Sequence, residues 1–380
     1  MAGVFLLTRL CDLTNLRIMM KKLIYMAVLL FAVISVKAQD YEAFNKFMRD
    51  YSKGWMTDYR KPAGNTMEMI KQVGEPAPEF YFDKKLNSKA LKGKFIVINF
   101  WSTWCGSCIN LVHDLDTVLF RNMQPYEGVQ FIGVDSHETV SEHEARKWWE
   151  DHGLNYSCGY GKGADACAEA FHGNHPSAII IDDQGIIRGR WDGWSPKLAE
   201  IIRMAIWALK IIPEQGIQAD LTTVKELVEE KEYLKALYLL EIMSENIESA
   251  TLKYQCKLEI SENSAIRYFE IIQEKYRDDE QYLTVMEGIM HLVLASDSRT
   301  DAVIKNGLDA TERLLRSGRN GDYRVHEAMG ILCYRYGESF RRKSVQALEN
   351  SIPAAKMNRV GDDVIKHLEE QVKIYREKLD

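Results

Sequence analysis

Residues 95–108 read FIVINFWSTWCGSC, and no other stretch of the chain says more about its fold. The first six residues, 95–100, form a nearly continuous apolar run rich in β-branched side chains, which is typical of a strand covered on both faces. Two cysteines follow, Cys105 and Cys108. The leucine and valine side chains after them recur at helical spacing, so a helix over about 105–120 is predicted to follow the strand.

The spacing of the two cysteines carries a chemical implication. Two cysteines three residues apart at a helix start lie on one face, close enough to form a disulfide. The first thiol would lie beside backbone N–H groups at the positive end of the helix dipole, which lowers its pKa from about 8.5 and favours the thiolate. The second cysteine, one turn further on, is better shielded. An accessible attacking thiolate with a buried resolving thiol is what thiol–disulfide exchange requires.

Strands and helices alternate along the residues around this segment. The predicted strands are 80–82, 129–134, 178–181 and 186–191, and the predicted helices are 140–151 and 196–211. The last two strands are joined by a tight turn and read as a hairpin. A β–α–β unit followed by a hairpin and a final helix predicts an α/β sandwich.

Five sequence motifs together resemble the thioredoxin superfamily, and within it the exported TlpA/ResA-like thiol–disulfide oxidoreductases. They are GEPAP at 74–78, NFW at 99–101, WCGSC at 104–108, GNHP at 173–176 and IIDDQG at 180–185. The resemblance implies a thioredoxin-like α/β sandwich and an enzyme that exchanges disulfides with protein substrates. It also implies an upstream membrane-embedded thiol donor, and no cofactor.

The resemblance also implies roles for single residues. Cys105 would be the nucleophile and Cys108 the resolving thiol, and the two would form a redox-active disulfide. Trp104 would be the aromatic residue flanking the site. Pro176 would be a cis-proline, which brings the backbone of His175 near the sulfurs, where an extended substrate segment can pair with it.

Three positions depart from the family pattern. Ser107 stands where thioredoxins usually carry proline, so the family's redox potential cannot be transferred. Asn99 takes the place of thioredoxin's buried aspartate, as is common in the TlpA/ResA-like branch, which puts a proton relay by that residue in doubt. His175 precedes the proline where smaller or β-branched residues are usual, and a protonated His175 would further stabilise the Cys105 thiolate.

The rest of the chain divides into three further regions. Residues 1–38 read as a cleavable signal peptide, with two lysines before about 14 apolar residues and a small residue at the cleavage point, and the true start is expected near Met19 or Met20. Residues 39–73 form a polar, partly helical lead-in to the thioredoxin-like domain at 74–211. Residues 212–380 are expected to be all-helical.

Helical segments of about 12 to 20 residues, separated by short polar breaks, make up most of the C-terminal region, and several adjacent pairs would form antiparallel hairpins. Around Met329 and Gly337 the sequence resembles a tetratricopeptide helix pair, although no clean period of about 34 residues emerges. This region is a candidate for binding a protein partner.

Charge and cysteine content limit the classes of partner and site. The net charge of −6 argues against nucleic acid as a partner. A signal peptide places the chain in the periplasm or cell envelope, where disulfides persist. No metal site is expected, because a zinc site would need two ligands beyond Cys105 and Cys108, and no second such pair or spaced histidine pair occurs. Cys158 and Cys167 can pair or remain separate thiols.

Two other classes of function stay open. A peroxidase of the peroxiredoxin type shares the fold, but that family's motif would place proline at position 98 and threonine at 102, where this chain has Ile98 and Ser102. The second is a non-catalytic thioredoxin scaffold with a helical partner-binding module. The presence of both cysteines argues against an inactive site.

Overall fold

The computed structural model describes residues 41–48, 72–122, 128–244, 246–296 and 298–379. The predicted signal peptide and most of the predicted lead-in lie outside these residues. Contacts between Cα atoms divide the chain into two compact units, Met1–Ile217 and Gln218–Asp380. The expected boundary between the two domains, at residues 211 and 212, lies a few residues before this division.

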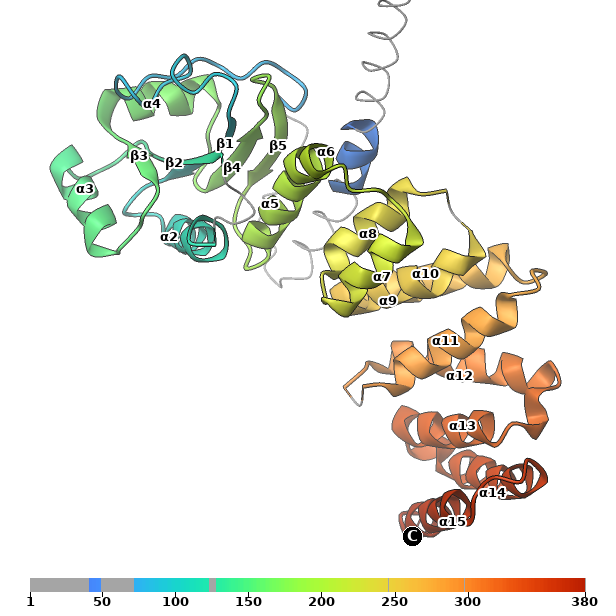
Figure 1. Ribbon diagram of the computed structural model, residues 1–380. Coiled ribbons are helices and arrows are strands. Elements are labelled where there is room, and N and C mark those ends of the chain that lie inside the picture. Colours follow the sequence, from blue (N-terminus) through green and yellow to red (C-terminus); the bar gives the residue numbers. More distant parts are fainter. Residues whose placement is uncertain (1–40, 49–71, 123–127, 245, 297, 380) are drawn as a thin grey trace, which may run out of the picture. The chain divides into compact units, whose positions relative to one another are not determined.

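A five-stranded mixed sheet forms the centre of the first unit (Figure 1). Its order is β3-β2-β1-β4-β5, and β1 pairs parallel with β2 and antiparallel with β4. The strands are β1 (Phe95–Trp101), β2 (Val129–Asp135), β3 (Ser157–Gly159), β4 (Ser177–Ile181) and β5 (Ile187–Asp192). Every residue of β1 is buried, as its unbroken apolar run predicts for a central strand.

Helices cover both faces of this sheet, with α4 on one face and α2 and α5 on the other (Figure 1). The elements are α2 (Gly106–Asp114), η1 (Leu115–Phe120), α3 (Glu142–Asp151), α4 (Gly161–Ala170), α5 (Leu198–Ile206), η2 (Trp207–Ile211) and α6 (Ile212–Gln215). Both η1 and η2 are π-helical continuations of the α-helix before them. Residues 41–48 form a further helix, with three buried apolar side chains.

The apolar core between the sheet and α4 is built from alternating strand residues. Ile96, Ile98 and Phe100 of β1 point into it, while Val97 and Asn99 belong to the opposite face, because side chains alternate along a strand. From α4 the core receives Ala164, Cys167 and Ala168.

The second unit consists of helices that pack against their neighbours in the sequence. They are α7 (Leu221–Glu229), α8 (Tyr233–Ile242), η3 (Ile247–Ser249), α9 (Ala250–Ile260), α10 (Glu262–Lys275), α11 (Tyr282–Leu294), α12 (Asp301–Arg316), η4 (Arg319–Gly321), α13 (Tyr323–Tyr336), η5 (Glu338–Phe340), α14 (Arg341–Met357) and α15 (Asp362–Glu377). Helices α13 and α14 pack especially closely at Gly330, whose carbonyl accepts a hydrogen bond from Ser344 Oγ at 2.6 Å. The predicted α/β sandwich followed by an all-helical region is thus confirmed.

One local prediction was wrong, and two elements were not predicted. Residues 80–82 form no strand: Tyr81 makes a single bridge to Asn87, because the Asp83 carboxylate accepts backbone N–H groups and turns the chain back at once. Residues 157–170, for which the sequence predicted neither a strand nor a helix, form β3 and α4. Glycine is needed at Gly161, the first residue of α4, where φ is +63°.

Other boundaries shift by a few residues. The helix predicted over 196–211 begins at Leu198, with Lys197 as its N-cap residue. Ser195 Oγ accepts a hydrogen bond from Lys197 N in the turn before it. The helix predicted over 140–151 begins at Glu142, because Ser141 forms a capping box with Glu144. Among the described residues, none of the helices is both long and apolar enough to span a bilayer.

Candidate active site at the start of helix α2

Cys105 lies where the central strand gives way to the helix. It is the N-cap of α2, and its Sγ accepts a hydrogen bond from Cys108 N at 3.3 Å. Its backbone N–H donates to the carbonyl of Ser102 at 3.1 Å, and its own carbonyl accepts the N–H of Ile109 at 3.1 Å. A sulfur in the N-cap position therefore takes the place of the oxygen that usually caps a helix.

The two sulfurs are joined in the structure. Cys105 and Cys108 form a disulfide with their Cα atoms 5.2 Å apart. Cys105 retains 7% of its surface exposed to solvent and Cys108 none, so Cys105 is the more accessible of the two. On reduction, the Cys105 thiolate would face the N–H of Cys108 and the positive end of the helix dipole, both of which lower a thiol pKa.

The loop after β2 is hydrogen-bonded to the residues that lead into Cys105. Ser102 Oγ donates to the carbonyl of Ser136 at 2.7 Å. The Glu138 carboxylate accepts the backbone N–H of Thr103 at 2.6 Å and its hydroxyl at 2.9 Å. Trp104 Nε1 donates to the carbonyl of His137 at 3.1 Å. Ser136, His137 and Glu138 thus each hold a different residue of the approach to Cys105, and we call residues 136–138 the supporting loop.

Trp104 and His175 lie together over this loop. The Trp104 side chain is 53% exposed, the third most exposed large apolar side chain among the described residues. Its ring centroid is 5.5 Å from that of His175, and the His137 ring lies 5.7 Å from His175 on the other side. Three aromatic rings thus cluster around the residue that precedes Cys105.

The peptide bond between His175 and Pro176 is cis. His175 Nε2 lies 3.1 Å from both the hydroxyl and the carbonyl oxygen of Ser136, so the loop before β4 is tied to the supporting loop. Burial, together with the nearby His137, lowers the pKa of His175. The imidazole is therefore mainly neutral at neutral pH, and the stabilisation of Cys105 by a protonated His175 is weakened.

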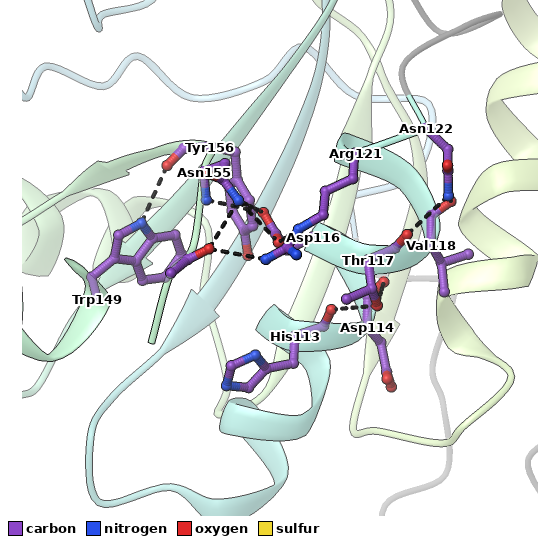
Figure 2. A network of polar contacts seen from close by, with 11 residues as sticks. His113, Asp114, Asp116, Thr117, Val118, Arg121, Asn122, Trp149, Asn155 and Tyr156 are labelled. Carbon is purple, nitrogen blue, oxygen red and sulfur yellow. Dashed lines mark hydrogen bonds and ion pairs between the residues drawn. The ribbon is translucent and has the colours of Figure 1, made fainter. Parts of the chain in front are cut away.

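A buried polar network lies behind the site, and Figure 2 shows the part of it around Asp116, Arg121 and Asn155. Tyr156 donates its hydroxyl to Asn99 Oδ1 at 3.1 Å, and no described residue accepts from Asn99 Nδ2. Next to Tyr156, Asn155 donates its backbone N–H to the Asp116 carboxylate at 2.9 Å. Arg121 pairs with the same carboxylate. The network connects η1, which continues the active-site helix, to the segment before β3.

Two carboxyl groups, one in the supporting loop and one just before it, escaped the sequence prediction. Asp135, the last residue of β2, is 3% exposed, and its side chain shares a hydrogen bond with Glu138. Burial, with Glu138 as the next contributor, raises the pKa of Asp135 to about 8. For Glu138, burial acts to raise the pKa, but the hydrogen bonds from Thr103 and Thr139 outweigh it and lower the pKa. The pair therefore holds one proton, on Asp135, and one negative charge, on Glu138.

The remaining cysteines of the described chain are free thiols. Cys158 and Cys167 do not pair: Cys158 Sγ accepts a hydrogen bond from Trp101 Nε1 at 3.3 Å, and Cys167 lies in the core under α4. Burial raises the pKa of each to about 12. Among the described residues, no group of three His, Cys, Asp or Glu side chains is arranged to hold a metal ion.

Of the residues singled out by sequence, five converge. Cys105, Cys108 and Trp104 meet at the start of α2, and His175 and Pro176 come next to them through the supporting loop. Asn99 lies deeper in β1, in the network with Tyr156. The sequence did contain a signal for Asp135, an acidic residue directly after the apolar strand 129–134. Parallel strands end at the same edge of a sheet, so this residue is expected at the edge where the segment to Cys105 begins.

Sequence comparisons agree on the first unit. Residues 73–190 match the sequence profile of the AhpC/TSA family. The chain is 29% identical over 118 residues to the thiol-disulfide oxidoreductase ResA of Bacillus thuringiensis (strain Al Hakam), an alignment that covers 30% of this chain and 66% of ResA. It is 28% identical over 148 residues to the thiol:disulfide interchange protein DsbE of Pasteurella multocida (strain Pm70), an alignment that covers 35% of this chain and 77% of DsbE. The chain thus spans just under two thirds of that ResA protein.

Among solved structures, a thiol:disulfide interchange protein of the thioredoxin family from Chlorobium tepidum TLS matches 34% of this chain and 95% of its own, with a TM-score of 0.29 and 24% identity. The segment 73–190 thus matches the AhpC/TSA family, and the chain is similar to thioredoxin-like proteins named ResA and DsbE.

Proposed function

We propose that this protein is a thiol–disulfide oxidoreductase that exchanges disulfides with protein substrates through Cys105 and Cys108, acting as a reductase. The observation that carries the proposal is the position of the disulfide: Cys105 caps a helix and retains some exposure, while Cys108 is fully buried one turn behind it. The names of the ResA and DsbE relatives support the same chemistry.

The reducing direction proceeds in two exchanges. The Cys105 thiolate attacks a substrate disulfide, forming a mixed disulfide and releasing the other substrate sulfur as a thiolate, which takes a proton. Cys108 then loses its proton and attacks Cys105 Sγ, which releases the second substrate thiolate. Two electrons pass to the substrate, and the protein is left as the disulfide seen in the structure. A dithiol donor must then reduce it again; the resemblance implies a membrane-embedded one.

The neighbouring groups have consistent roles in this scheme. The backbone of His175 would pair with an extended substrate segment, and Trp104 would cover its apolar side chains. Asn99 would contribute packing and polarity behind the sulfurs through Tyr156. We further propose that the chain is exported after cleavage near residue 38, and that the helical unit binds a protein partner.

A trapping experiment tests the central proposal. In the Cys108→Ser variant the mixed disulfide cannot resolve, so substrates remain attached to Cys105 and can be identified after non-reducing electrophoresis. The control is the Cys105→Ser, Cys108→Ser double variant, which must trap nothing. Recovery of the same proteins from both variants, or of none from the single variant, would count against the proposal. N-terminal sequencing of the protein from the cell envelope tests cleavage.

Peroxide consumption by the purified protein distinguishes the peroxidase alternative, which the sequence does not favour, because Ile98 and Ser102 stand where that family's motif has proline and threonine. If Cys105→Ser left the biological role unchanged, the scaffold alternative would replace the redox proposal.

A further inference from the structure

The supporting loop places a charged group directly against the approach to Cys105. Glu138 accepts two hydrogen bonds from Thr103, two residues before the nucleophile, at 2.6 and 2.9 Å. Its Oε1 also accepts the backbone N–H of Thr139 at 2.7 Å. A carboxylate with three short hydrogen bonds is held in one orientation, and so is the segment that it binds.

Within the supporting loop, it is the Glu138 carboxylate that brings a negative charge to the segment before Cys105. The other contacts, from Ser102, Trp104 and His175, end on backbone carbonyls of Ser136 and His137. A negative charge near a thiol at the N-terminal end of a helix opposes ionisation of that thiol, whereas the helix dipole favours it. The two influences act on the same sulfur with opposite signs.

We propose that Glu138 is a positioning residue for the dithiol–disulfide reaction, which fixes the segment leading into Cys105 and sets how readily Cys105 ionises. This inference rests on the proposed function. The carboxylate acts through Thr103 and through its field. It is not expected to touch the substrate.

Other titratable groups lie around Glu138. Asp135 lies beside it at the end of β2, Glu142 on α3 and Asp165 on α4. His137, whose backbone N–H donates to Asp165 at 2.8 Å, completes the group. Because Asp135 keeps its proton until about pH 8, Glu138 is the charge of this pair at neutral pH.

The test measures Cys105 alkylation against pH in the fully reduced, full-length protein, with the modified cysteine identified by peptide mass spectrometry. Glu138→Gln removes the charge and keeps an oxygen for the Thr103 backbone N–H, while its amide NH2 group can donate to the Thr103 hydroxyl. We expect the midpoint of Cys105 ionisation to fall by about half to one pH unit. The reduction potential should become less negative, because the reduced form is stabilised. Glu142→Gln is the matched control, since Glu142 pairs with Arg146 whereas Glu138 binds Thr103; its midpoint should equal that of the wild type.

A second variant separates position from charge. Glu138→Asp keeps the charge but is one methylene shorter, so the midpoint should stay near that of the wild type while the rate of attack on a model peptide disulfide falls several-fold. A Glu138→Gln midpoint no lower than that of Glu142→Gln, or a Glu138→Asp variant that attacks at the wild-type rate, would overturn the inference. If the wild-type Cys105 itself reacted like an ordinary thiol and did not cycle, the proposed function would fail instead.

Discussion

Replacing Asp135 with asparagine should stabilise the first unit relative to the wild type, and this difference in unfolding free energy should grow as the pH rises. Asp135 is 3% exposed and its Oδ1 has no hydrogen-bond partner among the described residues. Burial raises its pKa to about 8 from the ordinary 3.8. Asparagine has the same shape, donates a hydrogen bond to Glu138 as the protonated acid does, and never ionises.

The size and sign of the effect follow from proton linkage. Between the two pKa values the folded Asp135 keeps its proton and the unfolded one has lost it, so the wild type loses stability as the pH rises from about 4 to about 8, and no more above that. Each pH unit amounts to about 1.4 kcal/mol, so the variant should gain up to about 4 kcal/mol on the wild type between about pH 5 and pH 8.

Tryptophan fluorescence during urea unfolding is the appropriate assay, because all eight tryptophans precede Gln218 and report on the first unit. The protein is kept oxidised, so that Cys105 and Cys108 do not titrate. Asp183→Asn, in an exposed turn, is the control and should show no pH-dependent difference from the wild type. A difference between Asp135→Asn and the wild type that is constant from about pH 5 to pH 9 would refute the reasoning.

Three further predictions concern parts of the chain away from the sulfurs. Asp116→Ala removes a buried carboxylate that binds Asn155, and should lower the unfolding free energy of the first unit by about 2 to 3 kcal/mol in the same fluorescence assay. Gly330→Ala puts a Cβ 2.5 Å from Leu348 Cγ, so it should cost the helical unit about 1 to 3 kcal/mol by circular dichroism without moving the fluorescence transition. Burial raises the pKa of Cys167 to about 12, so at neutral pH this thiol should be alkylated only after unfolding, as counted by mass spectrometry; labelling of the native protein would contradict the placement.

The sequence predicted the central elements of the sandwich because strong, long patterns specify them. The apolar run 95–100 and the helix after it were placed nearly to the residue, and so was the hairpin of β4 and β5. Elements whose sequence pattern is weak were not predicted. β3 has three residues, and α4 begins with two glycines in its first three positions, so neither shows a clear period. At 80–82 the aromatic residues indicated a strand, but the turn at Asp83 ended the pairing after one bridge.

The sequence predicted those parts of the site whose residues stand close together in the chain. Cys105, Cys108 and Trp104 share one short segment, and the Pro176 motif could be matched separately. The role of Glu138 depends on which loop lies against Thr103, and that follows only from the pairing of β1 with β2. The pKa of Asp135 depends on its burial, which spacing along the chain does not reveal.

A redox titration of the full-length protein tests the central claim most directly. The protein is equilibrated in buffers of defined dithiol–disulfide ratio, quenched with acid and alkylated, and the state of Cys105 and Cys108 is read by mass spectrometry. The account predicts that both cysteines change together in one reversible two-electron transition, while Cys158 and Cys167 stay reduced throughout. A pair that stays oxidised or reduced at every ratio, or that exchanges no faster than an unfolded control peptide with the same two cysteines, would contradict it.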